Sequence, residues 1–438
     1  MKSPKGEHFD VAVIGGGAAG LMCACTCAEN GADCALFEKN KSQKKLSSEN
    51  FYDNAYLGKK LLITGKGRCN LTNDCTSEEF MKNVPRNAKF LYSAFGAFPP
   101  SKVMEFFEDC GVALKVERGN RVFPESDKAL DILTALKRRL RDSGCGVYNS
   151  EIKGIAKTDS AFTLTTAEGE TFTADKVVVC TGGLSYPITG STGDGYRFAE
   201  NFGHTVVTPK PSLVPLVSND DCIRSLGLQG LSLKNVKLTV YKKSGEKNKK
   251  IYSEQGEMLF THFGMSGPLV LSASAHIDSP EEGAYFASID LKPALDEKTL
   301  DARVLSDFGK YINKNLANAL GDLLPRSMIP AVIEKSGLSS EEKPNGISKA
   351  VRHTLVETLK NFCLSIDGFA PIDEAIITSG GVKTSEINPS SMESKLVPGL
   401  YFAGEVIDVD GYTGGFNLQI AFSTGYLAGA NAAKNNEP

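Results

Sequence analysis

Three glycines near the N-terminus, Gly15, Gly17 and Gly20, have the spacing G-x-G-x-x-G. An apolar run at 11–14 comes directly before them, and a run of small residues typical of a helix follows. In such a turn the first glycine permits a sharp change of direction, the second lets a pyrophosphate approach the backbone, and the third lets the helix pack on the strand. The N–H groups at Ala18 and Ala19 would then face the phosphates, whose charge the helix dipole favours. The segment therefore predicts a dinucleotide-binding turn.

An acidic residue, Glu38, stands at the end of the next apolar run, 34–37, and Lys39 follows it. A carboxylate at this position accepts hydrogen bonds from the ribose hydroxyls of an adenosine and repels a 2′-phosphate. Glu38 therefore favours FAD or NAD over NADP in this site, and we assign Lys39 to the same region.

A second glycine-rich segment lies near the C-terminus, and a segment of this type is expected to contact a flavin ring. The short apolar run 399–403 ends in Gly404 and Glu405, and Gly414 and Gly415 precede a helix-like stretch. The two ends of the chain are therefore expected to form two halves of one flavin site.

Three further segments are dense in glycine and polar residues, as expected of loops that converge on a cofactor. In 65–73, the glycines permit close backbone approach, Arg68 can neutralise phosphate, and Asn70 and Thr72 offer neutral hydrogen bonds; the alternative is a plain Asn/Gly-rich turn. The other two segments are 181–196 and 378–382. The cofactor-binding residues predicted from these segments are Gly67, Arg68, Cys69, Asn70, Thr72, Thr181, Gly182, Gly183 and Gly381.

The composition is that of an ordinary globular enzyme. The chain has 438 residues, which suggests two or three domains, and a formal net charge of −3. A net charge this close to zero does not attract nucleic acid or an anionic membrane in general. The lysine-rich run 242–250 is expected to form a solvated hairpin turn. No apolar run of eighteen residues is present. We therefore expect a cytoplasmic enzyme with a small-molecule substrate, no nucleic-acid partner and no membrane partner.

The 11 cysteines and five histidines do not predict a metal site or disulfides. Cys23, Cys25 and Cys27 would splay around a helix axis and could not close a tetrahedral site. The chain contains no C-x-x-C. Cys69 and Cys75 are not a redox pair either, because such cysteines are expected one helical turn apart and these two are more widely spaced. Free thiols and no metal are expected.

The order of expected elements is that of a doubly wound, Rossmann-like α/β domain with an insertion. Strand, helix and strand occupy 9–40, a meander occupies 152–158, 161–166 and 170–173, and a buried parallel strand occupies 174–180. The domain breaks near residue 200 and resumes near 371. Between these points, 205–270 is rich in strand patterns and 296–335 in helical ones, with no second strand–G-x-G-x-x-G–helix unit.

These segments together resemble the BaiN/RdsA-type family of NAD(P)/FAD-dependent oxidoreductases, which includes aminoacetone-oxidase-like members. The resemblance is carried by 15–20 with Glu38 and by 65–73, 181–196, 260–268, 378–382 and 399–425. It implies a glutathione-reductase-type FAD domain (1–200 and 371–438), a β-barrel-like substrate domain (201–272 and 346–370) and a small helical insert domain (273–345). One departure from the family pattern is the segment 41–57, which is longer than the usual link.

The resemblance also implies roles at the C-terminal end. Glu405 would hold the ribityl chain of FAD, and a helix starting near Asn417 and Leu418 would point its N–H groups at the flavin N1–C2=O region. There they would stabilise the anion that forms on reduction.

Three function classes are open at this point. The first is an FAD-dependent oxidoreductase in which NAD(P)H, as a transient reductant, reduces the flavin, and the flavin reduces an organic acceptor such as an enone. The second is an FAD oxidase of a small amine that yields hydrogen peroxide, and the third is a non-catalytic flavin-binding protein. The candidate catalytic side chains are His262, Tyr186 and Tyr412, since a histidine or phenol beside a flavin can donate a proton. The insertion is expected to build the substrate pocket.

Overall fold

The computed structural model describes residues 7–40, 56–245, 247–280 and 283–434. Its contacts divide the chain into two units, Met1–Pro211 with Ile372–Pro438, and Ser212–Pro371. The first unit runs past residue 200 because β10 (Val206–Ser212) pairs with β18 (Ile377–Val382) of the returning chain. The finer division of the insertion into two domains stays a prediction.

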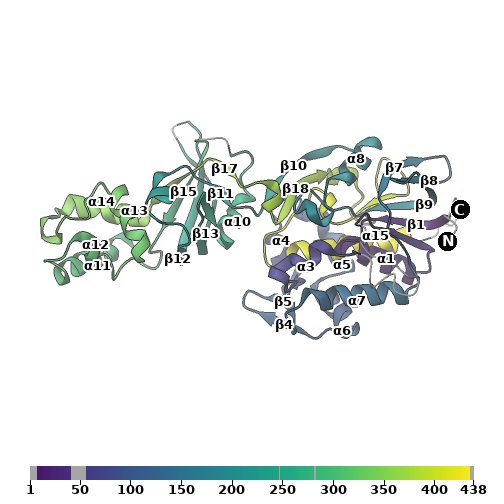
Figure 1. Cartoon of the computed structure of the whole chain (residues 1–438), viewed down its shortest axis with the longest axis horizontal. Coiled ribbons are helices and arrows are strands. Elements are labelled where there is room, and N and C mark those ends of the chain that lie inside the picture. The colour runs from purple at the N-terminus through teal and green to yellow at the C-terminus, as the bar shows by residue number, and fades with distance from the viewer. Residues whose placement is uncertain (1–6, 41–55, 246, 281–282, 435–438) are drawn as a thin grey trace. The chain divides into compact units, whose positions relative to one another are not determined.

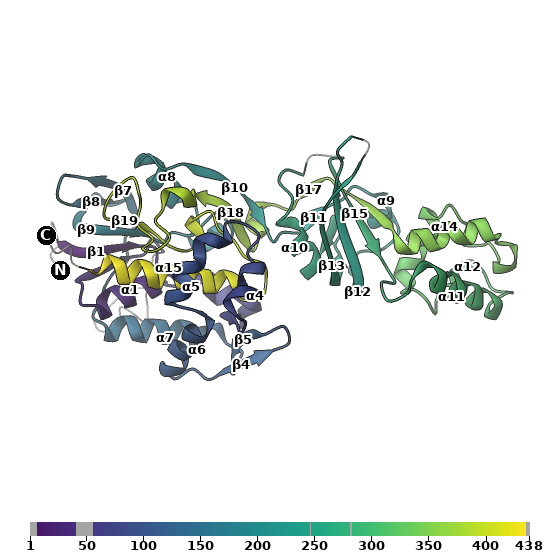
Figure 2. The same cartoon turned by 180° about the vertical axis from the view of Figure 1, so that it is seen from behind.

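The first unit is built on a sheet with strand order β6-β2-β1-β9-β8-β7 and with β19 beside β9. Strands β6, β2, β1, β9 and β19 pair in parallel, whereas β7, β8 and β9 pair antiparallel. Figures 1 and 2 show helices lying along this sheet, which confirms the predicted doubly wound α/β fold. The strands are β1 (His8–Ile14), β2 (Cys34–Phe37), β6 (Gly146–Tyr148), β7 (Ile152–Lys157), β8 (Phe162–Thr166), β9 (Thr171–Val179) and β19 (Leu400–Phe402).

The strand β9 corrects one sequence-based expectation. The third meander strand and the buried parallel strand were expected to be separate, but they form one continuous strand, Thr171–Val179. Its first residues pair with β8 and its last three with β19, while β1 pairs along most of its length. The change from alternating to continuous apolar residues at 174–179 therefore marks a change of neighbour and not a break in the strand.

Helices α1 and α15 lie side by side in both views of Figures 1 and 2. Both are rich in small residues, which are buried around nearly the whole helix. The Cβ that an alanine would add at Gly425 meets the carbonyl oxygen of Ala19, and one at Gly429 would lie 2.6 Å from the carbonyl oxygen of Cys23. The two backbones are therefore in direct contact. The helices of this unit are α1 (Ala18–Glu29), α3 (Lys59–Ile63), α4 (Ser77–Lys82), α5 (Tyr92–Ala97), α6 (Pro100–Asp109), α7 (Ala129–Asp142), α8 (Asp194–Asn201) and α15 (Phe416–Ala432).

A small antiparallel sheet has the order β3-β5-β4. It consists of β3 (Thr72–Asn73), β4 (Leu114–Glu117) and β5 (Arg121–Pro124). Through β3 this sheet carries the predicted loop 65–73 against the hairpin β4–β5.

The second unit contains a sheet with strand order β16-β15-β12-β13-β14-β11-β17. The strands at its two ends, β16 and β17, are separated in the chain only by Asp367. One stretch of chain therefore pairs with β15 on one side and with β11 on the other, which closes the sheet and confirms the β-barrel-like fold. The strands are β11 (Leu216–Val217), β12 (Ser232–Lys242), β13 (Lys249–Phe260), β14 (Gly264–Ser266), β15 (Tyr285–Asp290), β16 (Phe362–Ile366) and β17 (Gly368–Phe369).

Helices of the second unit share a core with its strands. Leu300, Val304 and Leu355 from the helices belong to the same buried cluster as Ile289 and Leu364. The helices are α9 (Asp221–Ser225), α10 (Pro268–Ser274), α11 (Glu297–Lys310), α12 (Leu316–Ala319), α13 (Ile329–Lys335) and α14 (Lys349–Lys360). Within the described residues, no helix has the length and apolar character needed to cross a membrane.

We predict that Gly425→Ala destabilises the first unit by about 1–3 kcal/mol, because the added methyl group forces α15 away from Ala19. The control is Gly96→Ala in α5, where an added Cβ meets nothing within 4 Å. That change is expected to be neutral or stabilising, since alanine is the better helix former. Thermal unfolding of both variants tests this, and equal melting temperatures would contradict the helix contact.

Candidate functional site

A cavity lies in the first unit at the carboxyl ends of its parallel strands. Ile14 ends β1, Phe37 ends β2, and Cys180 and Ala403 directly follow β9 and β19. All four residues line the cavity. Open α/β sheets bind their ligands at this edge, so the fold places the cavity where a cofactor is expected.

Of the residues predicted to bind the cofactor, one group lines this cavity and the other does not. The residues in its wall are Gly15, Gly17, Ala18, Ala19, Glu38, Lys39, Thr181, Gly182, Glu405, Asn417 and Leu418. Within the part of the chain that the structure describes, the following predicted residues do not line the cavity: Gly20, Gly67, Arg68, Cys69, Asn70, Thr72, Gly183, Gly381, Gly404 and Gly415. The assignment of each as a cofactor ligand stays a prediction.

The three glycines of the N-terminal turn have different tasks. Gly15 has a φ of +104°, and a Cβ there would lie 2.5 Å from the carbonyl oxygen of Cys180. A Cβ at Gly20 would collide with the carbonyl oxygen of Gly15. A Cβ at Gly17 meets nothing within 4 Å, although Gly17 lines the cavity. Gly15 and Gly20 are therefore needed by the fold, whereas Gly17 leaves space for a ligand.

The helix α1 begins at this turn with backbone N–H groups that have no partner within the helix. Its N-cap, Gly17, makes no side-chain capping bond, and the first turn of α1 contains no acidic residue among those described. An N-terminus of this kind attracts an anionic group, because its N–H groups lack partners and the helix dipole is positive there.

Glu38 is a buried carboxylate at the end of β2, with a relative exposure of 6%. Its Oε2 accepts a hydrogen bond from the Gly16 N–H at 2.8 Å. Its Oε1 accepts from the Asn40 backbone at 2.8 Å and from Asn40 Nδ2 at 2.7 Å. Burial raises the pKa of Glu38, while these hydrogen bonds act in the opposite direction. The carboxylate thus fixes the glycine turn to the end of β2, and it also faces the cavity.

Glu405 forms a second polar cluster in the cavity wall. Its Oε1 accepts hydrogen bonds from Ser185 Oγ and from the Thr378 N–H, both at 2.9 Å. Its Oε2 lies 2.6 Å from Lys60 Nζ. Glu405 was predicted from the sequence to be a site residue, whereas Lys60 and Ser185 were not. The signal for Lys60 was the pair Lys59–Lys60 directly after Gly58, at the start of a short apolar helix.

The helix α15 begins at Phe416, close to the predicted start. Its N-cap, Gly415, has a φ of +97° and packs against the backbone of Thr72, where a Cβ could not fit. The Asn417 side chain exchanges hydrogen bonds with the Gly411 backbone at 2.8 and 2.7 Å. Asn417 therefore holds the preceding loop, while the first turn of α15 borders the cavity through Asn417 and Leu418.

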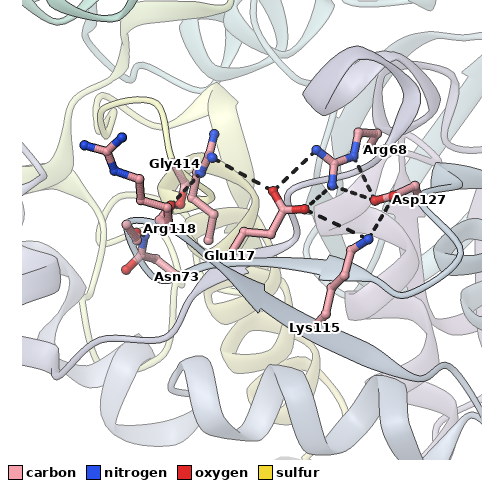
Figure 3. A network of polar contacts seen from close by, with 9 residues as sticks. Arg68, Asn73, Lys115, Glu117, Arg118, Asp127 and Gly414 are labelled. Atoms are coloured by element: carbon pink, nitrogen blue, oxygen red, sulfur yellow. Dashed lines mark hydrogen bonds and ion pairs between the residues drawn. The ribbon is translucent and has the colours of Figure 1, made fainter. Parts of the chain in front are cut away.

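Arg68 points toward the hairpin β4–β5 (Figure 3). Its Nε lies 2.8 Å from Asp127 Oδ1, its Nη2 contacts Glu117, and its guanidinium lies 4.2 Å from the centroid of the Phe123 ring. Two carboxylates thus compensate the charge that the sequence analysis assigned to phosphate. Next to it, burial raises the pKa of the Cys69 thiol to about 12, so this cysteine stays a neutral thiol.

Other residues of the loop 65–73 connect it to the α15 segment. Asn73 Nδ2 donates to Gly119 O at 2.9 Å and to Gly414 O at 3.0 Å (Figure 3). The Thr72 hydroxyl is hydrogen-bonded to Gln419 on α15. The Asn70 Oδ1 is buried without a hydrogen-bond partner among the described residues. In this structure the loop supports the start of α15.

Neither Tyr186 nor Tyr412 lines the described part of this cavity, and His262 belongs to the second unit. Tyr186 has a φ of +52°, and its ring centroid lies 5.9 Å from Lys60 Nζ. The Tyr412 N–H donates to Asn83 O at 2.9 Å. His262 is exposed on the second unit and packs its ring edge-to-face on Phe263. Their catalytic roles stay predictions. The long segment noted at 41–57 lies mostly outside the described residues.

The cavity fits the parts of FAD. Gly17 leaves room beside the uncapped start of α1, which suits a diphosphate, and the carboxylates of Glu38 and Glu405 suit hydroxyl-bearing groups on either side. Thr181 Oγ1 is buried at the cavity wall and has no partner among the described residues, so it retains hydrogen-bonding capacity.

We predict that Gly17→Val folds normally but purifies without FAD, because its side chain would occupy the space left for the diphosphate. Gly20→Val is the contrasting variant and should lose folded protein, since its Cβ meets the Gly15 backbone. Flavin absorbance and circular dichroism measure the two effects. A wild-type FAD content in Gly17→Val would refute the phosphate-loop assignment.

We predict that Glu38→Ala weakens FAD binding by about 1–3 kcal/mol, the cost of leaving hydrogen-bonding groups without a partner. Titration of the apoprotein with FAD measures the affinity, and turnover at saturating FAD should be nearly unchanged. An equal fall in turnover would give Glu38 a role beyond holding the cofactor.

Comparisons with known proteins identify the family to which the chain belongs. The family model described as HI0933-like protein Rossmann domain matches residues 9–431. A 3-dehydro-bile acid delta(4,6)-reductase of Clostridium scindens is 30% identical over 97% of this chain and 99% of its own. The ribosomal RNA dihydrouridine synthases of Escherichia coli and Haemophilus influenzae are each 30% identical over 98% of this chain and 100% and 99% of their own. The chain therefore belongs to the HI0933-like (BaiN/RdsA-type) flavoprotein family and is an FAD-dependent oxidoreductase.

Proposed function

We propose that this enzyme uses NAD(P)H to reduce a carbon–carbon double bond conjugated to a carbonyl group in a small organic acceptor. The observation that carries the proposal is the cavity itself, which extends from one dinucleotide-binding turn to the start of α15. The inserted chain has no second G-x-G-x-x-G sequence, so a nicotinamide cofactor would act as a transient reductant.

The names of the relatives support this chemistry. A delta(4,6)-reductase and a dihydrouridine synthase both describe the addition of two hydrogens to a carbon–carbon double bond. For this chain the net reaction would be NAD(P)H plus a proton plus the unsaturated acceptor, giving NAD(P)⁺ and the saturated product. When bound, FAD would accept the hydride of NAD(P)H and then deliver a hydride to the acceptor.

The residues of this chain would contribute charge stabilisation and position. The backbone N–H groups at the start of α15 are suited to stabilising negative charge that develops beside them. Glu38 and Glu405 would fix the two sides of the cofactor through hydroxyl groups. Tyr186 and Tyr412 are candidates for donating the proton that the second carbon of the double bond needs after hydride addition to the first.

Reduction of uridine in RNA is a second candidate. Two relatives with this printed activity cover nearly the whole chain. In addition, the hairpin β12–β13 presents exposed lysines in its turn and at the adjoining strand ends, although the overall formal charge is −3. These lysines are Lys242, Lys243, Lys247, Lys249 and Lys250.

An anaerobic experiment separates these candidates. FAD-loaded protein is mixed with NADH or NADPH, and we expect the flavin absorbance to bleach. A 4-en-3-one steroid is then added, followed in a separate sample by unmodified ribosomal RNA. We expect reoxidation by the enone. Reoxidation by RNA alone would favour the second candidate, and absence of bleaching with peroxide release from small amines in air would establish the oxidase alternative.

A further inference from the structure

Lys60 is a cavity-lining lysine held by two polar groups. Its Nζ lies 2.6 Å from Glu405 Oε2 and donates a hydrogen bond to Ser185 Oγ at 2.6 Å. The side chains of Lys60 and Glu405 are only 22% and 12% exposed. An ion pair with this little exposure keeps a defined position, unlike most pairs on a protein surface.

Both ends of this ion pair are attached to the glycine turn. Lys60 lies two residues after Gly58, whose N–H donates to Gly16 O at 2.8 Å. Glu405 directly follows Gly404, where an added Cβ would lie 2.7 Å from the Ala19 methyl group. The Lys60–Glu405 pair is therefore tied to the segment 16–19, where α1 begins.

A diphosphate at the start of α1 would be bound more tightly by a nearby positive charge, which the turn itself lacks. The first turn of α1 offers backbone N–H groups but no charged side chain within the described chain. A lysine ammonium is a common phosphate-binding group and acts there as a point charge. This charge would have to come from a basic residue that lines the cavity and can turn toward the phosphates.

The other candidate side chains have partners elsewhere. The Arg68 guanidinium is paired with Glu117 and Asp127 on the hairpin side (Figure 3). Lys39 Nζ lies 2.6 Å from Asp194 Oδ2, and Lys59 Nζ donates to Asn40 Oδ1 at 3.0 Å. Lys59 shares the Gly58 segment with Lys60, but among the described residues its partner Asn40 reaches the turn only through Glu38. The partner of Lys60, Glu405, directly follows Gly404, which packs against Ala19 in the first turn of α1.

We propose that Lys60 supplies the positive charge that binds the FAD diphosphate, and that Glu405 holds its ammonium group at the cavity until the cofactor binds. Glu405 also accepts hydrogen bonds from Ser185 and from the Thr378 N–H, so its carboxylate stays partnered when Lys60 turns toward phosphate. This inference rests on FAD as the cofactor and not on the acceptor that the enzyme reduces.

The first test measures FAD affinity of the full-length apoprotein by flavin fluorescence, without any turnover. Lys60→Met should weaken FAD binding by about 10- to 100-fold, as expected for the loss of a charged hydrogen bond, and Lys60→Arg should keep most of the affinity. Lys89→Met, which removes an exposed lysine outside the described cavity wall, controls for net charge and should bind FAD normally. Normal FAD affinity in Lys60→Met, or a larger loss in Arg68→Met, would overturn the proposal.

Fragments of the cofactor locate the contact. ADP, which carries the diphosphate, should lose affinity for Lys60→Met by the same factor as FAD, whereas riboflavin, which has no phosphate, should bind as it does to the wild type. A loss confined to riboflavin would place Lys60 at the ribityl chain or ring and refute the assignment.

A double variant separates direct contact from an effect through Glu405. In Lys60→Met the Glu405 carboxylate loses its cation and could repel phosphate by itself. Lys60→Met combined with Glu405→Gln removes that charge, and we expect FAD affinity to stay about tenfold or more below that of Glu405→Gln alone. Recovery to the Glu405→Gln level would mean that Lys60 only neutralises Glu405. Circular dichroism of each variant confirms that the protein is folded.

Discussion

The close backbone contact around Ala19 is the constraint on which the site depends. The carbonyl of Ala19 faces Gly425 on α15, and its methyl group faces Gly404 at the end of β19. Two residues earlier in the turn, space is left for a ligand at Gly17. The N-terminal and C-terminal segments can form one cavity only because glycines at these positions let them approach the same residue. A side chain at Gly404 or Gly425 would separate the two halves of the site.

Charge in the cavity is arranged in pairs that cross between segments. Glu38 accepts from the Gly16 backbone, Lys39 meets Asp194, and Lys60 meets Glu405. Each pair joins two different segments of the chain, one of which is the glycine turn or a segment hydrogen-bonded to that turn. The same carboxylates that suit a cofactor's hydroxyl groups thus also hold the cavity wall together, which lowers the reorganisation that binding requires.

Local sequence was sufficient where the physical requirement is local. The spacing of Gly15, Gly17 and Gly20 predicted the turn, and Gly415 predicted the start of α15, because a positive φ or a close approach is encoded at the position itself. The partners of Arg68 could not be predicted from its local sequence. Its sequence neighbours suit a phosphate loop, but Glu117 and Asp127, brought close by the hairpin β4–β5, compensate its charge. Lys60 was missed for the same reason, since its partner Glu405 is far away in the chain.

The position of the insertion in the chain follows from the pairing of β10 with β18. The chain leaves the first unit through β10 and returns through β18, and these strands are hydrogen-bonded neighbours. The first unit can therefore form this separate two-stranded sheet whatever is inserted, since the two ends of the insertion are adjacent. The returning strand also carries Thr378, whose N–H donates to Glu405 and whose hydroxyl accepts from the Leu184 and Ser185 N–H groups. The strand by which the chain returns to the first unit is thus part of the polar cluster around Glu405, so the segment that follows the insertion also holds the cavity wall in place.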